Sequence, residues 1–171
     1  PIWDTYRISQ PHVAVVAGSV ERWSLVRELV QSTLHWPNDW ALLVHSRYRG
    51  MDHQIKDISY ERNVYFSETH FATASEAASF FCQADLGIAL YHPTYDDEYT
   101  GLNLEHLGLS SGKTAMYLSG GLPVLTTDSG YYPRLLQQYN AGIVVKDVSE
   151  IGRALAIHAC SLNSMRRNAA S

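Results

Sequence analysis

Residues 104–127 read LEHLGLSSGKTAMYLSGGLPVLTT. The middle of this stretch predicts a helix over about 111–119, which ends at the paired glycines 120 and 121. The apolar run 124–127 comes next and predicts a short buried strand. A polar loop, a helix and a strand therefore follow one another within two dozen residues, as they do in proteins that alternate helices with parallel strands.

The same alternation extends outward in both directions. Apolar runs predict six strands, at residues 12–17, 40–45, 64–66, 86–90, 124–127 and 143–145. Patterns of helical period, with capping residues, predict helices at about 20–34, 73–83, 111–119, 133–140 and 149–160. This order predicts an α/β fold, a doubly wound, Rossmann-like parallel sheet of about six strands with helices on both faces.

The chain length favours a single domain. At 171 residues, we expect one domain over residues 12–162, an extended lead-in over 1–11 and a frayed C-terminal tail over 163–171. Residues 47–63 are polar and predict no regular helix. The segment from Tyr91 to about Leu109 is predicted to be a long polar and aromatic loop.

Composition excludes several classes of protein. With 46% hydrophobic and 18% charged residues, the chain is not intrinsically disordered. Its net charge of -4 argues against nucleic-acid binding, which needs basic patches. No apolar stretch is long enough to span a membrane, and no signal pattern opens the chain, so we expect a cytoplasmic protein.

The predicted helix at 111–119 begins with residues suited to binding phosphate. Ser110, Ser111, Gly112, Lys113 and Thr114 supply hydroxyls, a position for close approach and a cation beside the unpaired amides of a helix N-terminus. The alternative is an ordinary helix cap without a ligand, and the residues alone leave both possibilities open.

Gly112-Lys113-Thr114 also invites comparison with the ATP-binding P-loop. That motif needs a glycine four spacers ahead of its Gly-Lys pair, and here Leu107 occupies that position. A nucleotide-binding kinase is therefore a weaker hypothesis.

Several further pieces, taken in order, resemble a known family. They are ADLGIAL at 84–90, EHLGL at 105–109, GLPV at 121–124, DSG at 128–130 and AGIVV at 141–145. Their order and spacing resemble the C-terminal, nucleotide-sugar donor-binding domain of GT-B fold glycosyltransferases, group 1-like. The resemblance covers roughly residues 12–160.

The resemblance implies a function. It indicates the nucleotide-sugar-binding half of a glycosyltransferase of glycan biosynthesis, which transfers a hexosyl group from a UDP- or GDP-sugar to a sugar or glycan acceptor. It implies that the acceptor is held by an N-terminal domain absent from these residues, so that the isolated domain is inactive. It requires no cofactor and no metal, and the acidic trio Asp96, Asp97 and Glu98 is expected to be solvated.

The resemblance also implies roles for individual residues. Glu105 would orient the sugar and Lys113 would offset the charge of the departing diphosphate. The other implied donor contacts are Gly18 and Ser19 after the first strand, Ser67, Glu68 and Thr69 at the base, Ser110, Ser111, Gly112 and Thr114 at the diphosphate, and Gly130.

Two features depart from the family pattern. Met116 stands where the family has a ribose-binding glutamate, and methionine accepts a hydrogen bond from a ribose diol far more weakly. Ser19 stands where a basic residue is expected, although Arg22 lies one turn later. The alternative function is therefore a non-catalytic, GT-B-like scaffold or binding module.

Overall fold

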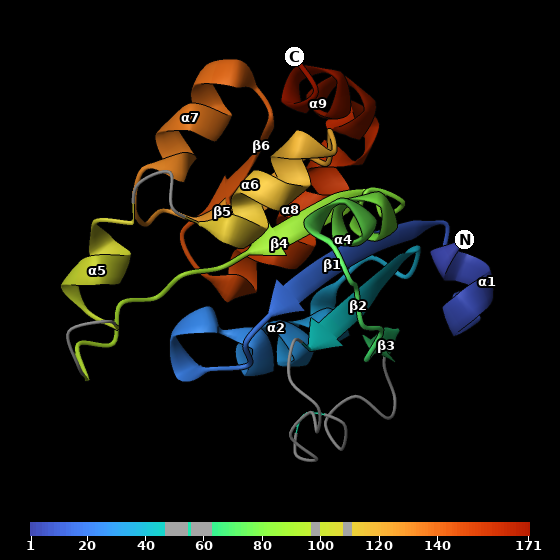
Figure 1. The fold of residues 1–171 in the computed structure, drawn as a ribbon, viewed down its shortest axis with the longest axis horizontal. Coiled ribbons are helices and arrows are strands. Elements are labelled where there is room, and N and C mark those ends of the chain that lie inside the picture. Colours follow the sequence, from blue (N-terminus) through green and yellow to red (C-terminus); the bar gives the residue numbers. More distant parts are fainter. Residues whose placement is uncertain (47–54, 56–62, 97–99, 108–110) are drawn as a thin grey trace.

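The computed structural model describes residues 1–46, 55, 63–96, 100–107 and 111–171. Its strands are β1 (His12–Gly18), β2 (Trp40–Ser46), β3 (Val64–Ser67), β4 (Leu86–Ala89), β5 (Val124–Thr127) and β6 (Gly142–Val145). They form one sheet in the order β3-β2-β1-β4-β5-β6, and every neighbouring pair is parallel (Figure 1). The predicted doubly wound, Rossmann-like sheet is confirmed.

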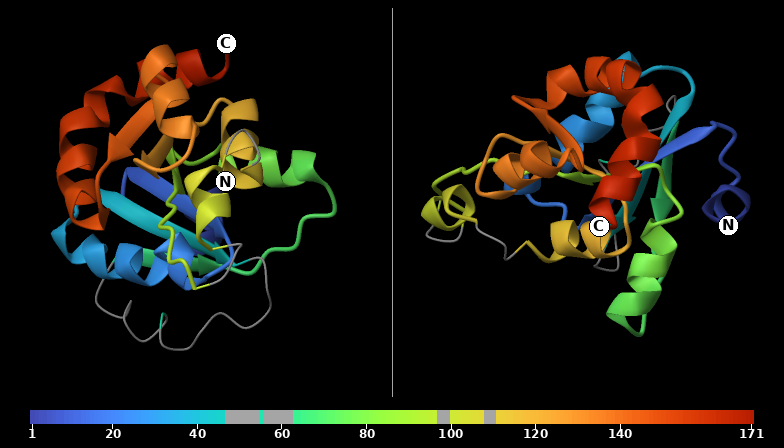
Figure 2. Two further views of the ribbon diagram at one scale, coloured as in Figure 1. Left: turned by 90° about the vertical axis from the view of Figure 1, so that its left-hand side faces the viewer. Right: turned by 90° about the horizontal axis from the view of Figure 1, so that it is seen from above.

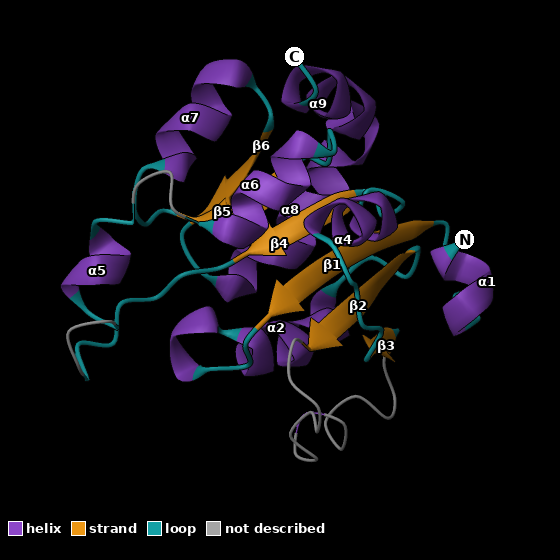
Figure 3. Ribbon diagram, in the orientation of Figure 1, coloured by secondary structure: helices purple, strands orange, loops and turns teal. Residues whose placement is uncertain are grey.

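Helices cover both faces of this sheet (Figures 1 and 2). The α-helices described are α1 (Ile2–Tyr6), α2 (Val26–Ser32), α4 (Ala74–Phe81), α5 (Leu102–Glu105), α6 (Gly112–Ser119), α7 (Tyr132–Tyr139), α8 (Ile151–His158) and α9 (Leu162–Ala169). The short 3-10 turns are η1 (Arg22–Ser24), η2 (Thr33–His35), η3 (Val148–Glu150) and η4 (Ala159–Ser161). Figure 3 shows α4 and α6 in front of the sheet, with α2 and α8 behind it.

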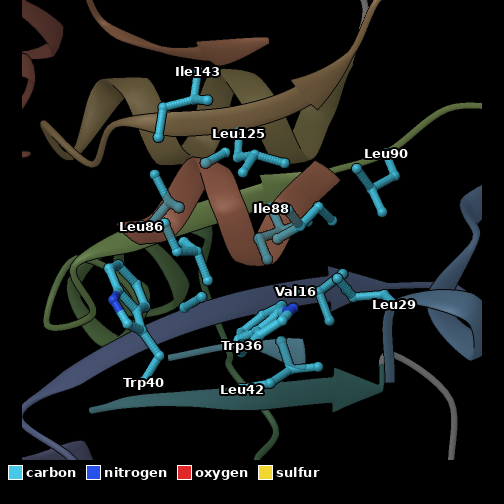
Figure 4. Close-up of a cluster of buried hydrophobic side chains, with 14 of the residues drawn as sticks. Val16, Leu29, Trp36, Trp40, Leu42, Leu86, Ile88, Leu90, Leu125 and Ile143 are labelled. Atoms are coloured by element: carbon cyan, nitrogen blue, oxygen red, sulfur yellow. The ribbon is translucent and has the colours of Figure 1, made fainter. Parts of the chain in front are cut away.

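Successive residues of a strand belong alternately to two separate hydrophobic clusters. In β1, Ala14 and Val16 join the cluster beneath α2, α8 and α9, whereas Val13 and Val15 join the one beneath α4 and α6. Figure 4 shows part of the first cluster, in which Trp36 and Trp40 pack near Leu42 and Leu86. Continuous apolar strand sequences follow from this arrangement, because both faces of the sheet are buried.

Helix α6 is fitted to the sheet through one tyrosine. The side chain of Tyr117 is fully buried, and its ring lies over Gly87 in β4 so closely that an added Cβ would come within 2.5 Å of it. The Tyr117 hydroxyl accepts a hydrogen bond of 2.9 Å from the backbone N–H of Ala17 in β1. One side chain therefore fixes α6 to two neighbouring strands.

Both expectations for the chain ends are wrong. Residues 2–6 form α1 rather than an extended lead-in, because Ile2 is buried and the Tyr6 hydroxyl donates to Ser67. Residues 162–169 form α9 rather than a frayed tail. Met165 is buried, and the Arg166 guanidinium donates to the carbonyls of Cys82 and Ala84. Tertiary packing decides such short helices, so their local sequence is a weak guide.

The first predicted helix, 20–34, is broken into three pieces. Leu25 has a φ of 52°, which separates η1 from α2, and α2 then passes into η2. Glu21 rather than Ser19 is the N-cap of η1. The predicted loop after β4 contains the short helix α5, and the irregular segment expected at 47–63 lies almost entirely outside the described residues.

We predict that Gly87→Ala destabilises the protein by about 1–3 kcal/mol, because the new methyl group overlaps the Tyr117 ring. The measurement is the free energy of unfolding in urea. Gly112→Ala is the matched control, since nothing lies within 4 Å of its added Cβ, and it should be neutral or slightly stabilising. Equal stability of the two variants would contradict the role given to Tyr117.

Candidate functional site

The site lies where the order of the strands reverses. The chain proceeds from β1 to β2 in one direction and from β4 to β5 in the other, so the switch point is between β1 and β4. Ligands of doubly wound sheets bind at such a point, outside the carboxyl ends of the strands. Gly18 ends β1 there, and Tyr91 follows β4.

Lys113 extends from the first turn of α6 into this switch point. A Cβ placed on Gly18 would lie 3.9 Å from both Cε and Nζ of Lys113. The Nζ atom lies 5.2 Å from the centre of the Tyr91 ring and 5.8 Å from that of Trp23, within the range of cation–π attraction. The structure therefore brings together Gly18 and Lys113, which were predicted, with two aromatic rings.

The ammonium group of Lys113 is buried and has no hydrogen-bond partner among the described residues. Burial lowers the pKa of Lys113 from its ordinary value of 10.5 to about 8. An ammonium in this position has lost water without gaining an anion, which costs free energy. A negatively charged ligand would remove that cost.

A network of hydroxyls holds the start of α6 in place. Ser111 is its N-cap and accepts from the N–H of Thr114 at 3.3 Å, while the two side-chain hydroxyls are 2.8 Å apart. The Tyr91 hydroxyl bonds to Ser111, and both the N–H and the carbonyl of Tyr91 bond to the hydroxyl of Thr127. The helix predicted over about 111–119 thus begins after Ser111, which serves as its cap.

Within the described ranges, this arrangement leaves two backbone donors at the helix start. The first hydrogen bond of α6 runs from the N–H of Ala115 to the carbonyl of Ser111, so the N–H groups of Gly112 and Lys113 precede it. They lie at the positive end of the helix dipole, beside the Lys113 ammonium. Two amides and a cation are the donor set that suits a phosphate or diphosphate.

Glu105 and Gly130 line a different cavity. This cavity of about 350 Å³ is bounded by Glu105, His106, Gly130, Tyr131 and Arg134. The exposed carboxylate of Glu105 accepts a 2.6 Å hydrogen bond from Tyr95, and Gly130 packs against the carbonyl of Leu107 with a φ of 78°. The structure thus groups two predicted residues beside the loop that leads into α6.

The predicted base-binding residues lie two strands away from Gly18, at the end of β3. Ser67 is buried and bonds to the hydroxyl of Tyr6 and to Nδ1 of His45, and Thr69 also contacts Tyr6. Burial lowers the pKa of His45, with a smaller effect from His70. Glu68 is exposed. Ser67 is thus already engaged by the protein itself.

Other candidates take no part in the Lys113 cluster. Arg22 forms an exposed ion pair of 3.4 Å with Asp96, so it does not supply the basic residue missing at position 19. Ser110, Asp97 and Glu98 lie outside the described residues. Within the described ranges, no three His, Cys, Asp or Glu side chains gather as metal ligands would, and no helix could cross a membrane.

The sequence did not indicate that Trp23 and Tyr117 contribute to the candidate site. Trp23 has helical spacing with its apolar neighbours and is predicted to be an ordinary core residue. Its contact with Lys113 depends on the break at Leu25, for which leucine gives no signal. Tyr117 and Lys113 are four residues apart in α6, so they share a face of the helix, and that spacing is visible in the sequence.

Of the known proteins with which the chain was compared, only solved structures are similar to it. No family model and no curated protein matches the chain. The C-terminal domain of LpcC, a glycosyl transferase group 1 family protein from Francisella tularensis, has a TM-score of 0.64 and 17% identity, over 99% of this chain and 85% of that one. HepE of Anabaena, solved with UDP and glucose, has a TM-score of 0.69 and 13% identity, over 99% of this chain and 44% of that one.

WaaG, a glycosyltransferase involved in lipopolysaccharide biosynthesis, has a TM-score of 0.64 and 17% identity, over 98% of this chain and 44% of that one. The chain thus spans less than half the length of WaaG and HepE. At these identities the likeness concerns the fold. The chain has the fold of the C-terminal domains of GT-B glycosyltransferases of group 1, as the sequence resemblance predicted.

Proposed function

We propose that this chain is the donor-binding domain of a glycosyltransferase and that Lys113 and the first amides of α6 bind the diphosphate of a nucleotide sugar. The observation that carries the proposal is the buried ammonium of Lys113 at the switch point of the sheet, for which the described residues provide no hydrogen-bond partner. A group 1 C-terminal domain among the similar structures, and a UDP complex of HepE, support it.

The chemistry that this donor set provides is electrostatic. When a sugar leaves a nucleoside diphosphate, negative charge develops on the departing oxygen. The ammonium of Lys113 and the N–H groups of Gly112 and Lys113 would stabilise that charge in a site largely shielded from water. Glu105, in its separate cavity beside the same loop, would hold hydroxyls of a hexosyl group.

The remaining assignments belong to the same proposal. The donor is a UDP- or GDP-sugar, and Ser67, Glu68 and Thr69 lie near its base. The acceptor is bound by a further domain outside these residues, so the 171-residue chain binds donor without completing transfer. Gly130 shapes the wall of the sugar cavity, and Ser110, which lies outside the described residues, is a further proposed contact of the diphosphate.

A non-catalytic binding module is the second candidate, and Met116 favours it. This side chain is partly buried and packs against the hydrophobic cluster beneath α4 and α6. It therefore offers no polar group for a ribose. Hydrolysis of UDP- and GDP-sugars by a longer form of the protein that includes a second domain distinguishes the candidates, since a binding module releases no sugar.

We predict that UDP or GDP binds the protein and that Lys113→Met weakens this binding at least tenfold. The reason is that hydrogen bonds to a charged group contribute about 1.5–3 kcal/mol. Titration calorimetry measures the affinities. Lys146→Met is the matched control, because Lys146 is exposed and lines a different cavity, and it should stay within twofold of the unmodified protein. Equal binding by both variants, or no binding at millimolar nucleotide, would refute the proposal.

We also predict that Lys113→Met makes the ligand-free protein more stable at pH 7. The pKa of Lys113 is about 8 in the folded protein and ordinarily 10.5, so folding disfavours the charged form. The buried charge therefore lowers the free energy of unfolding by up to about 3 kcal/mol. This loss of stability is present in full below pH 8 and disappears as the pH rises to 10.5.

The stability difference between the variant and the unmodified protein should therefore be about 1–3 kcal/mol at pH 7 and should shrink toward pH 10.5. Urea unfolding of both proteins across this range measures it, and effects of other titrating groups cancel in the difference. A variant less stable at pH 7 would show that the ammonium already has a favourable partner.

A further inference from the structure

The ammonium that we assign to the diphosphate is covered. Nζ of Lys113 is buried, and the rings of Trp23 and Tyr91 lie 5.8 and 5.2 Å from it. The two ring planes are within 3° of parallel, with centres 6.3 Å apart. A phosphate needs direct contact with the ammonium to replace its lost water. In this conformation, such a ligand cannot reach Nζ.

The two aromatic rings that cover Nζ of Lys113 are held in place in different ways. Tyr91 is fastened to Thr127 and Ser111 by its backbone and its hydroxyl. Trp23 lies in a short segment, residues 19–24, between two residues of positive φ, Gly18 at 122° and Leu25 at 52°. A leucine in the left-handed region is conformationally strained. The segment that carries Trp23 is therefore bounded at each end by an unusual backbone conformation.

Residues 19–24 form a small unit with hydrogen bonds of its own, in which Val20 and Trp23 pack against the two hydrophobic clusters and Ser24 is buried. Within it, the N–H of Glu21 donates to the hydroxyl of Ser24, which donates in turn to the carbonyl of Glu21. Two polar contacts join it to the loop after β4. They are a hydrogen bond from the N–H of His92 to the carbonyl of Trp23 and the exposed ion pair Arg22–Asp96. Exposed ion pairs stabilise little.

A cavity lies beside residues 19–24. A cavity of about 260 Å³ is lined by Val20, Glu21 and Arg22 of the segment and by Arg27, Glu28 and Ile55. Trp23 itself is partly exposed, although it packs against the cluster beneath α4 and α6. Displacing Trp23 would uncover Lys113 at the expense of its packing against that cluster.

We propose that residues 19–24 form a flap, with Trp23 closed over Lys113 in the ligand-free protein, and that a diphosphate binds only after this flap opens. This inference rests on the proposed function. The indole and the diphosphate compete for one ammonium, so the closed flap lowers both the rate and the affinity of nucleotide binding.

The first test measures access to Lys113 without any ligand. The sequence contains three lysines, 56, 113 and 146, so peptide mass spectrometry can follow acetic anhydride labelling of each one. Acetic anhydride reacts with the neutral amine, and burial lowers the pKa of Lys113, so slow labelling of this residue reports the cover and not protonation. We expect Lys113 to label at least tenfold more slowly than the exposed Lys146.

The same experiment on variants identifies the cover. Trp23→Ala should accelerate labelling of Lys113 at least fivefold, and Trp23→Phe should restore much of the protection. Trp3→Ala, which removes a partly buried indole from α1, is the control and should leave labelling of Lys113 unchanged. Rapid labelling of Lys113 in the unmodified protein, or equal rates in Trp23→Ala, would overturn the flap.

The second test uses UDP and GDP in stopped-flow mixing, followed by tryptophan fluorescence. For the unmodified protein, the observed rate should level off at high nucleotide because opening becomes limiting. The variant Trp23→Ala is followed instead by competition with a fluorescent nucleotide. Its observed rate of binding should keep rising with nucleotide concentration, and its affinity for the nucleotide should be at least threefold higher.

The outcomes separate the two proposals. Nucleotide binding with rates and affinities that Trp23→Ala leaves unchanged would reject the flap and keep the proposed function. If neither protein binds nucleotide, the proposed function is rejected. The proposal that a diphosphate binds beneath the open flap is then rejected as well. Slower and weaker binding by Trp23→Ala would make Trp23 a ligand contact and would also reject the flap.

Discussion

The hydrogen bond from the N–H of Ala17 to the hydroxyl of Tyr117 links the helix that carries the candidate site to the strand beside it. The tyrosine reaches β1 by crossing β4, and only a glycine at position 87 leaves space for its ring. Lys113 is one turn earlier on the same helix face, so the register that Tyr117 imposes also sets where the ammonium lies. Placement of the ammonium is thus a consequence of core packing, and rigid elements hold the site more accurately than loops can.

A buried ammonium with no hydrogen-bond partner, as Lys113 has none in the described part of the chain, is uncommon in the interior of a protein. Folding alone would favour an apolar side chain at position 113, since a buried charge without an anion opposes folding. Such a conflict between local stability and the residue present is expected at functional sites. The neighbouring aromatic rings compensate only in part, because their attraction for a cation is weaker than that of an anion.

Much of the fold could be predicted from the sequence, because apolar runs such as 12–17 and 124–127 are long enough to mark buried strands. The cap at Ser111 and the contact of Lys113 with the carboxyl end of β1 follow from local chemistry and from the topology of doubly wound sheets. Helices α1 and α9 could not be predicted, since each is stabilised by partners more than 60 residues away. The position of Trp23 was missed for a related reason: a strained leucine at residue 25 changes the direction of the chain, and leucine carries no turn signal.

Arg166 joins two distant parts of the chain. Its guanidinium satisfies the carbonyls of Cys82 and Ala84, at the turn between α4 and β4, from a distance of 84 and 82 residues along the sequence. Closing so large a loop is entropically costly and is possible only once the partner has been synthesised. The turn between α4 and β4 therefore lacks these two hydrogen bonds until residue 166 has been made.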